Sequence, residues 1–170
     1  LGITSDTKTP DGGEIIRYST GEPTGVFVDN AQGLLRAPER TDSERRRALE
    51  LAMEECLEKG VTSVTDAGAS EEVLELYREF ARAGRLRARI YAMVTGHETM
   101  RAVGQPEIGL GEGFLTIRAV KLYADGALGS RGAALLEPYS DDAGNLGLLV
   151  TPPERLLEAT RDALARGFQV

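Results

Sequence analysis

Between residue 41 and the end of the chain, the hydrophobic pattern alternates repeatedly between helical and strand-like spacing, and this alternation constrains the fold more than any other feature. Helices are expected at residues 41–60, 70–84, 98–103 and 151–167, and strands at 61–66, 87–94, 115–124 and from 168 onward. Parallel strands need long crossover connections, which are usually helices, so the alternation predicts an α/β fold, either a barrel or a doubly wound sheet. Gly109, Gly111 and Gly113 precede a strand instead of following one, so a dinucleotide-binding turn is not indicated.

The first 40 residues carry a different pattern, that of a β-hairpin. Two runs with β-branched and aromatic residues, 14–19 and 24–28, flank the turn-forming sequence Thr20-Gly21-Glu22-Pro23. We therefore divide the chain into a hairpin-containing insertion segment, residues 1–40, and an α/β portion, residues 41–170.

Composition excludes several classes of function. The 170 residues carry 20 basic and 27 acidic side chains, a net charge of −7, so no broad cationic surface is available for nucleic acid. The apolar runs are far shorter than the roughly 20 residues that cross a bilayer, so we expect no membrane contact and a cytoplasmic protein. Cys56 is the one cysteine and is interpreted as an ordinary buried thiol. His97 is the one histidine, expected in a loop or helix cap, so a histidine-rich metal site made by this chain alone is excluded.

Lys121 is the outlier of the chain, because it interrupts the apolar run of an expected strand. Period-two alternation predicts that Lys121 shares a face of that strand with Ile117. A lone ammonium group is costly to bury, so it either pairs with a carboxylate, such as Asp66 or Asp125, or loses its proton and becomes a nucleophile. A neutral lysine of this kind would suit a Schiff-base enzyme of the aldolase type, and the residues alone leave these alternatives open.

The sequence around this lysine resembles the amidohydrolase 3 family of metal-dependent hydrolases. The resemblance is carried by residues 120–134, VKLYADGALGSRGAA, and continues through Pro138-Tyr139-Ser140-Asp141 to Gly147-Leu148-Leu149. Weaker matches are GVTSVTDAG at residues 60–68 and GEPTG at residues 21–25. The resemblance implies a distorted (β/α)8 TIM-like barrel, of which this chain would be an internal fragment that holds about strands 2 to 5, preceded by the hairpin insertion.

The resemblance also implies roles for individual residues. In that family a lysine at the end of the fourth barrel strand can be carboxylated to a carbamate that bridges two metals, and the matching position is Lys121. Asp125, Ser130 and Arg131 would follow on the adjoining loop and contact the substrate, with Arg131 able to bind a carboxylate through two hydrogen bonds. The alternative is structural: Asp125 and Ser130 satisfy backbone groups of the loop, and Arg131 is a solvated or paired surface charge.

One or two divalent metals, most often zinc, are implied as cofactors of the intact protein. The other ligands of the family are histidines and an aspartate that cannot be placed in this chain, since the first strand would precede it and the fifth-strand histidine would follow Val170. We therefore expect the isolated chain to bind no metal and to be inactive. In the intact protein, metal-activated water would hydrolyse an amide or other C–N bond of a small-molecule substrate.

Two further expectations concern the chain as a piece of a longer protein. It starts without methionine and ends on the apolar run Phe168-Gln169-Val170, which agrees with an internal fragment. Part of a barrel leaves strand edges unpaired, so self-association or strand exchange between copies is expected. A non-catalytic folding or assembly module therefore remains an alternative to the hydrolase and to the Schiff-base enzyme.

Overall fold

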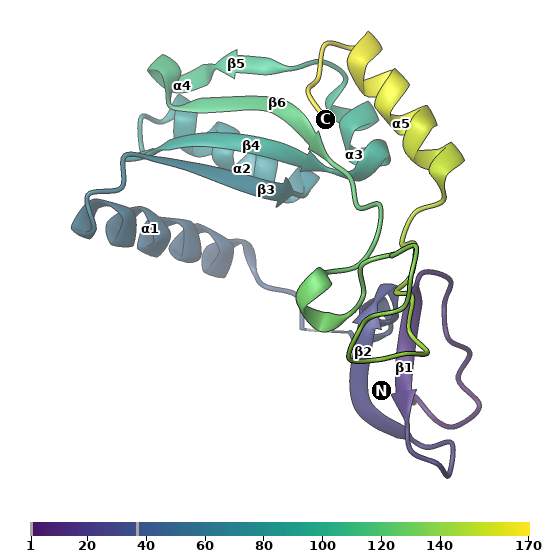
Figure 1. Ribbon diagram of the computed structural model, residues 1–170. Coiled ribbons are helices and arrows are strands. Elements are labelled where there is room, and N and C mark those ends of the chain that lie inside the picture. The colour runs from purple at the N-terminus through teal and green to yellow at the C-terminus, as the bar shows by residue number, and fades with distance from the viewer. Residues whose placement is uncertain (1, 37) are drawn as a thin grey trace. The chain divides into compact units, whose positions relative to one another are not determined.

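The computed structural model describes residues 2–36 and 38–170, which form two compact units (Figure 1). The sheet unit comprises residues 39–122 and 157–170. The hairpin unit comprises residues 1–38 and 123–156. The hairpin unit thus contains, besides the hairpin segment, a long loop that the sequence pattern assigned to the α/β portion.

A four-stranded sheet organises the sheet unit (Figure 1). Its strands lie in the order β3 (Ser63–Ala69), β4 (Arg89–Thr95), β6 (Leu115–Lys121) and β5 (Glu107–Gly109). The first three are parallel, and β5 is antiparallel to β6. The helices are α1 (Asp42–Glu58), α2 (Glu71–Arg82), α3 (Gly96–Val103), the short α4 (Leu110–Gly113) and α5 (Pro153–Ala165). The predicted parallel α/β arrangement is confirmed, but within the described residues the sheet is open and forms no closed barrel.

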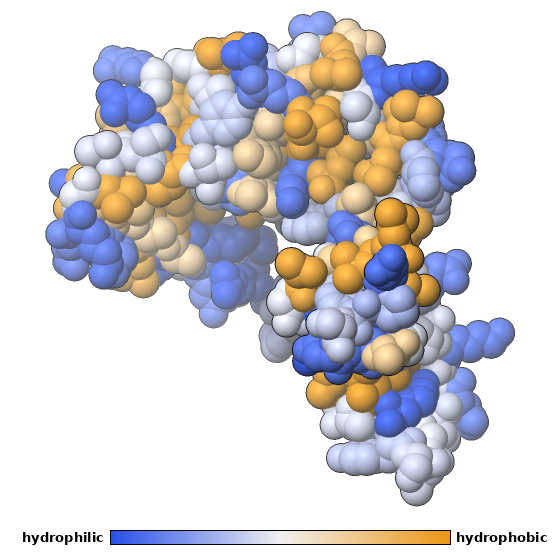
Figure 2. All heavy atoms as spheres, in the orientation of Figure 1, coloured by the Kyte–Doolittle hydropathy of each residue, from blue (hydrophilic) through white to orange (hydrophobic). Residues whose placement is uncertain are grey.

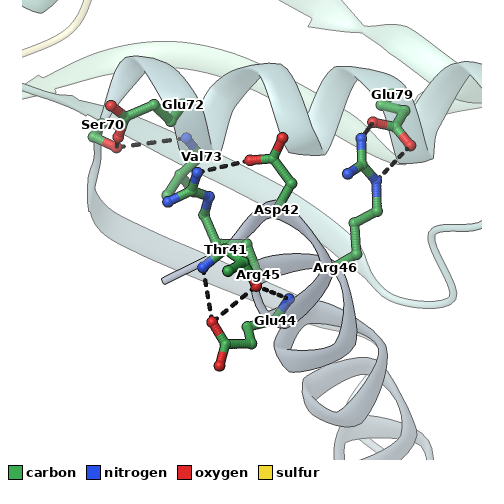
Figure 3. A network of polar contacts seen from close by, with 9 residues as sticks. All are labelled: Thr41, Asp42, Glu44, Arg45, Arg46, Ser70, Glu72, Val73 and Glu79. Carbon is green, nitrogen blue, oxygen red and sulfur yellow. Dashed lines mark hydrogen bonds and ion pairs between the residues drawn. The ribbon is translucent and has the colours of Figure 1, made fainter. Parts of the chain in front are cut away.

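Local side-chain hydrogen bonds fix where the first two helices begin (Figure 3). Thr41 and Glu44 form the capping box at the start of α1: the Thr41 backbone N–H donates to Glu44 Oε2 at 2.7 Å, and the Glu44 N–H donates to Thr41 Oγ1 at 3.3 Å. Ser70 caps α2 in the same way, by accepting a hydrogen bond from the Val73 N–H. Both caps satisfy backbone donors that have no partner inside the helix.

One face of the sheet carries the hydrophobic core. Ile90, Ala92 and Val94 of β4 alternate on that face and are at most 3% exposed. They pack with buried residues of the neighbouring strands and helices, which include Leu74, Phe80, Met100, Leu115 and Ile117. No helix of the described residues is long and apolar enough to cross a membrane. Apolar side chains also remain on the surface, where they lie among charged ones (Figure 2).

The outer edge of β6 is shared by two segments. Glu107 of β5 pairs with Ile117, and two residues further along Gln169 forms a parallel bridge with Ala119. The strand expected from residue 168 is thus present as this single bridge. The sequence pattern did not predict β5, which lies between the helix expected at residues 98–103 and the strand expected at residues 115–124. Arg78 of α2 holds β5 through a two-pronged ion pair with Glu107.

The hairpin unit contains the expected antiparallel pair, β1 (Gly13–Arg17) and β2 (Pro23–Asp29), followed by a short 3-10 helix, η1 (Asn30–Leu34). The loop after β6 returns to this hairpin and carries a second 3-10 turn, η2 (Leu128–Ser130). The hairpin is therefore not a free appendage. It forms one compact unit with the loop that bears three of the predicted site residues.

Candidate functional site

A β-bulge decides the direction in which Lys121 points. Ala92 of β4 pairs with Ile117 of β6. The next residue of β4, Met93, pairs with Ala119, so β6 contains one extra residue between these two pairs. Because successive side chains alternate between the faces of a strand, an inserted residue moves all later side chains to the other face. The prediction that Lys121 shares a face with Ile117 is therefore wrong.

Burial agrees with this change of face. Ile117 and Val120 both lie in the hydrophobic core, at 0% and 3% exposure, which simple alternation would not allow for residues separated by three positions. Lys121, the next residue, pairs with Thr95 at the carboxyl ends of β6 and β4. Lys121 is half-buried and lies on the face opposite the helix-covered core. In a barrel this is the inner face, and its carboxyl end is where catalytic groups occur.

Asp66 belongs to the opposite face. It pairs with Ala92 in the parallel register, on the core side of the sheet. There its Oδ2 accepts a hydrogen bond of 2.7 Å from the hydroxyl of Tyr77 on α2. Burial, together with this hydrogen bond, raises the pKa of the Tyr77 hydroxyl. The register thus directs Asp66 to Tyr77 and not toward the face that carries Lys121.

Asp125 and Ser130 bind backbone groups of their own loop. Asp125 Oδ2 accepts a hydrogen bond of 3.0 Å from the N–H of Ala134. Ser130 Oγ donates to the carbonyl oxygen of Ala127 at 3.2 Å. Both hydrogen bonds close the loop on itself, which is the structural role that the sequence left open for these residues.

Arg131 forms a two-pronged ion pair with Asp141. Its Nη2 donates to Asp141 Oδ2 at 2.6 Å and its Nε donates to Oδ1 at 3.1 Å. The pair lowers the pKa of the Asp141 carboxyl group and raises the pKa of the guanidinium. Both side chains are about half exposed, at 48% and 60%. The guanidinium is therefore oriented by a carboxylate while its edge stays open to solvent.

Ser130 and Arg131 lie on the wall of a shallow hollow of about 480 Å³ in the hairpin unit. The hairpin contributes Glu14, Ile16 and Val28 to the same hollow. Its remaining lining comes from Gly132, Asp142, Gly144, Asn145, Gly147 and Leu148. Two of the predicted substrate-binding residues therefore share one concave surface with apolar and acidic side chains of the hairpin. Asp125 does not line this hollow.

His97 joins two helices. Its Nε2 lies 2.9 Å from Asp162 Oδ2, so the histidine of α3 is tied to α5. Arg166 and Arg101 contact the same carboxylate, at 2.8 Å and 3.4 Å. The hydrogen bond with His97 and then that with Arg166 lower the pKa of Asp162. Across residues 2–36 and 38–170, no group of three or more His, Cys, Asp or Glu side chains could hold a metal ion.

Comparison with known proteins identifies the family of this chain. The model of the amidohydrolase family matches residues 1–170. The chain belongs to the amidohydrolase family. It is 34% identical over 180 residues to the Bacillus subtilis (strain 168) protein named "Putative amidohydrolase YtcJ", which covers 99% of this chain and 33% of that protein. It is also 38% identical over 92 residues to N-substituted formamide deformylase of Arthrobacter pascens, which covers 51% of this chain and 17% of that protein.

A solved structure also resembles this chain. An uncharacterized metal-dependent hydrolase from Pyrococcus horikoshii OT3 superposes with a TM-score of 0.71 at 29% sequence identity. The match covers 91% of this chain and 33% of that chain. This amidohydrolase chain therefore spans about a third of the length of the Bacillus subtilis protein and of the Pyrococcus horikoshii hydrolase. That share agrees with the expectation of a fragment, and the open sheet corresponds to part of a longer fold.

Sequence reasoning missed two partners of the candidate site. Asp141 entered the sequence analysis only as part of a motif of the family resemblance, although its carboxylate orients Arg131. Asp29 at the end of β2 was not predicted as a site residue, yet its Oδ2 lies close to Gly126 and Gly132 of the loop that carries Ser130 and Arg131. No spacing pattern links Asp29 to a loop almost a hundred residues later, so this proximity could not be predicted from the sequence.

Proposed function

We propose that this chain is part of an amidohydrolase that cleaves an amide or other C–N bond of a small molecule with metal-activated water. Membership of the amidohydrolase family and similarity to a metal-dependent hydrolase support this reaction class. The observation that carries the proposal is the location of Lys121, half-buried at the carboxyl end of β6 and opposite the helix-covered core.

The role proposed for Lys121 is that of a carboxylated metal ligand. The neutral amine attacks CO2 to form an N–C bond, one C–O double bond becomes an oxyanion, and the proton on nitrogen passes to solvent. The product is a carbamate with two oxygen atoms and a negative charge. Only the neutral form of the amine can react in this way.

The described residues do not by themselves complete a metal site. They contain no group of three His, Cys, Asp or Glu side chains suited to a cation, and His97 is bound to Asp162. The proposal therefore assigns a single ligand, Lys121, to this chain and one or two divalent ions, most often zinc in this family, to the whole protein. When bound, such an ion lowers the pKa of water and polarises a carbonyl group.

The proposed substrate contacts lie in the loop after β6. Arg131 is held in place by Asp141, and Ser130 shares the wall of the same hollow. We assign to both the binding of the substrate's polar groups. Asp125 is proposed to act on the substrate indirectly, by fixing the loop through its hydrogen bond to Ala134.

The test uses the complete gene product and an N-substituted formamide, because one relative carries that substrate class in its name. Hydrolysis is expected to stop when a chelator removes divalent metal and to return when zinc is added. Lys121→Ala is expected to reduce kcat/KM by about 100-fold or more, as the loss of a group that holds a catalytic metal does. Incubation with ¹³C-bicarbonate should give a carbamate signal that Lys121→Ala abolishes.

Lys59→Ala is the matched control. Lys59 lies at the end of α1 and pairs on the surface with Glu55 at 2.8 Å, so its removal should leave the rate and the carbamate signal unchanged. Full activity of Lys121→Ala would contradict the proposal. So would trapping of a carbonyl substrate on Lys121 by borohydride, which would indicate a Schiff-base enzyme instead.

A further inference from the structure

Asp29, the last residue of β2, adopts an unfavourable backbone conformation. Its φ is 47° and its ψ is −121°, a combination that glycine adopts readily and other residues rarely do. Strained residues of this kind persist only where the surrounding structure forces them, and they cluster at functional sites. Ala31, two residues further along the chain, is 0% exposed, so the backbone is anchored close to the strained residue.

The carboxylate of Asp29 does not perform the role that aspartate usually has at this position. Asp29 is the N-cap residue of η1, but its side chain makes no capping hydrogen bond. Within the described part of the chain, its Oδ2 is buried and has no hydrogen-bond partner. A buried acceptor without a donor destabilises the fold, since it has lost its hydrogen bonds to water.

The same oxygen lies against both ends of the loop segment that contains η2. A Cβ atom added to Gly126 would be 2.8 Å from Asp29 Oδ2, and one added to Gly132 would be 3.3 Å from it. Glycine at both positions therefore lets the loop approach the carboxylate. Ser130 and Arg131 lie between these two contacts, all within the hairpin unit.

These observations indicate a single role for Asp29. Asp29 combines a strained backbone with an unpaired oxygen, and glycine at this position would remove both penalties. What glycine could not supply is the contact with the two ends of the η2 turn. We propose that Asp29 is a positioning residue: its carboxylate fixes the Gly126–Gly132 turn in the shape that presents Ser130 and Arg131 to the substrate. The functional half of this statement rests on the proposed hydrolase activity.

Hydrogen exchange tests the structural half on the 170-residue chain. The reporters are the backbone N–H groups inside the turn, of which Arg131 donates to Leu128 at 3.0 Å and Gly132 donates to Ala127 at 3.0 Å. Asp29→Gly is expected to speed exchange at these amides about tenfold, because local opening becomes easier. The Tyr18 amide, which donates to Glu22 at 2.9 Å elsewhere in the hairpin unit, should stay unchanged. The unfolding midpoint should not fall below that of the wild type.

Two further variants complete this experiment. Asp29→Asn keeps the size and shape of the side chain, so the amides of the turn should exchange as slowly as in the wild type. Asp6→Gly is the matched control for the aspartate-to-glycine change, because Asp6 is exposed and lies in the same unit. Unchanged exchange in Asp29→Gly would overturn the proposal. Uniformly faster exchange with a lower midpoint would also overturn it, because Asp29 would then be merely structural.

Kinetics of the complete gene product test the functional half. Asp29→Gly should raise KM for the formamide about tenfold with little change in kcat, since the loop binds the substrate and the metal ligands are untouched. Asp29→Asn should show the wild-type KM. Faster turn exchange with an unchanged KM would overturn the role toward substrate. If the wild-type protein does not hydrolyse amides at all, the proposed function fails, while the exchange result still decides whether Asp29 holds the turn.

Discussion

Replacing Glu107 with glutamine is expected to destabilise the sheet unit more than any exposed ion-pair change. Glu107 is the first residue of β5, and it binds the guanidinium of Arg78 through Nε, at 3.0 Å, and through Nη2. Arg78 is 8% exposed, the one charged residue in the buried set of the described chain. The contact with Glu107 is the main reason why the pKa of Arg78 is raised. The pair therefore joins α2 to the edge of the sheet around a buried cation.

The size of the effect follows from what remains after the change. Removing one partner of a fully buried ion pair costs about 3–5 kcal/mol. Arg78 keeps a second partner, Glu75, at 2.5 Å, and the Glu107 side chain is itself 29% exposed. We therefore expect Glu107→Gln to cost about 2 kcal/mol. Glu75 is 62% exposed, so Glu75→Gln should cost less than about 1 kcal/mol.

Urea unfolding followed by far-ultraviolet circular dichroism measures both variants, with the slope m checked for constancy. The two substitutions are matched, since each removes one carboxylate charge from the same guanidinium. Equal losses in the two variants, or a loss below about 0.5 kcal/mol for Glu107→Gln, would refute the reasoning that burial sets the strength of this pair.

Three further outcomes are expected. Thr41→Ala removes the cap of α1 and should lower stability by about 1 kcal/mol in the same urea assay; no change would contradict the capping box. Gly147→Ala should lower the unfolding midpoint sharply, because φ is 71° and the new Cβ would lie 1.9 Å from the Ala133 carbonyl oxygen; Gly144→Ala, with open space around it, is the control. Because the pKa of Asp162 is lowered in the folded protein, the ionised carboxylate contributes stability at pH values above the ordinary aspartate pKa of about 4. This contribution is lost as the pH falls through the folded-state pKa. Thermal melts between pH 5 and pH 2 should therefore show a smaller acid-induced drop for Asp162→Asn than for the wild type, and equal drops would contradict this contribution.

Much of the fold could be predicted from the sequence because the longer elements combine a hydrophobic period with a stop or start signal. The helix expected at residues 41–60 is α1, with its capping box, and the strand expected at residues 87–94 is β4. β5 was missed because three residues flanked by glycine carry no measurable period. Its position depends on the ion pair with Arg78, a contact between distant parts of the chain that local patterns do not encode.

The candidate site was less predictable than the fold. Lys121 could be singled out both from the apolar run that it interrupts and from the family resemblance, but simple alternation predicted the wrong face because one residue of β6 bulges out of the ladder. No residue type marks that bulge in the sequence. The loop residues show the same limit: the ion pair of Arg131 with Asp141 and the contact of Asp29 with the η2 turn both arise from how the loop folds back. Hydrogen-bond partners within loops depend on tertiary packing, which a single sequence does not reveal.

The shared edge of β6 has a consequence for assembly of the sheet. Gln169 meets Ala119, and the site two residues earlier, opposite Ile117, is already taken by Glu107. A slip of two residues would keep every side chain on its proper face, so alternation alone cannot prevent it. Here the short antiparallel segment physically blocks such a slip toward the start of β6. A three-residue strand pinned by one arginine can thus act as an alignment stop for the segment that pairs beside it.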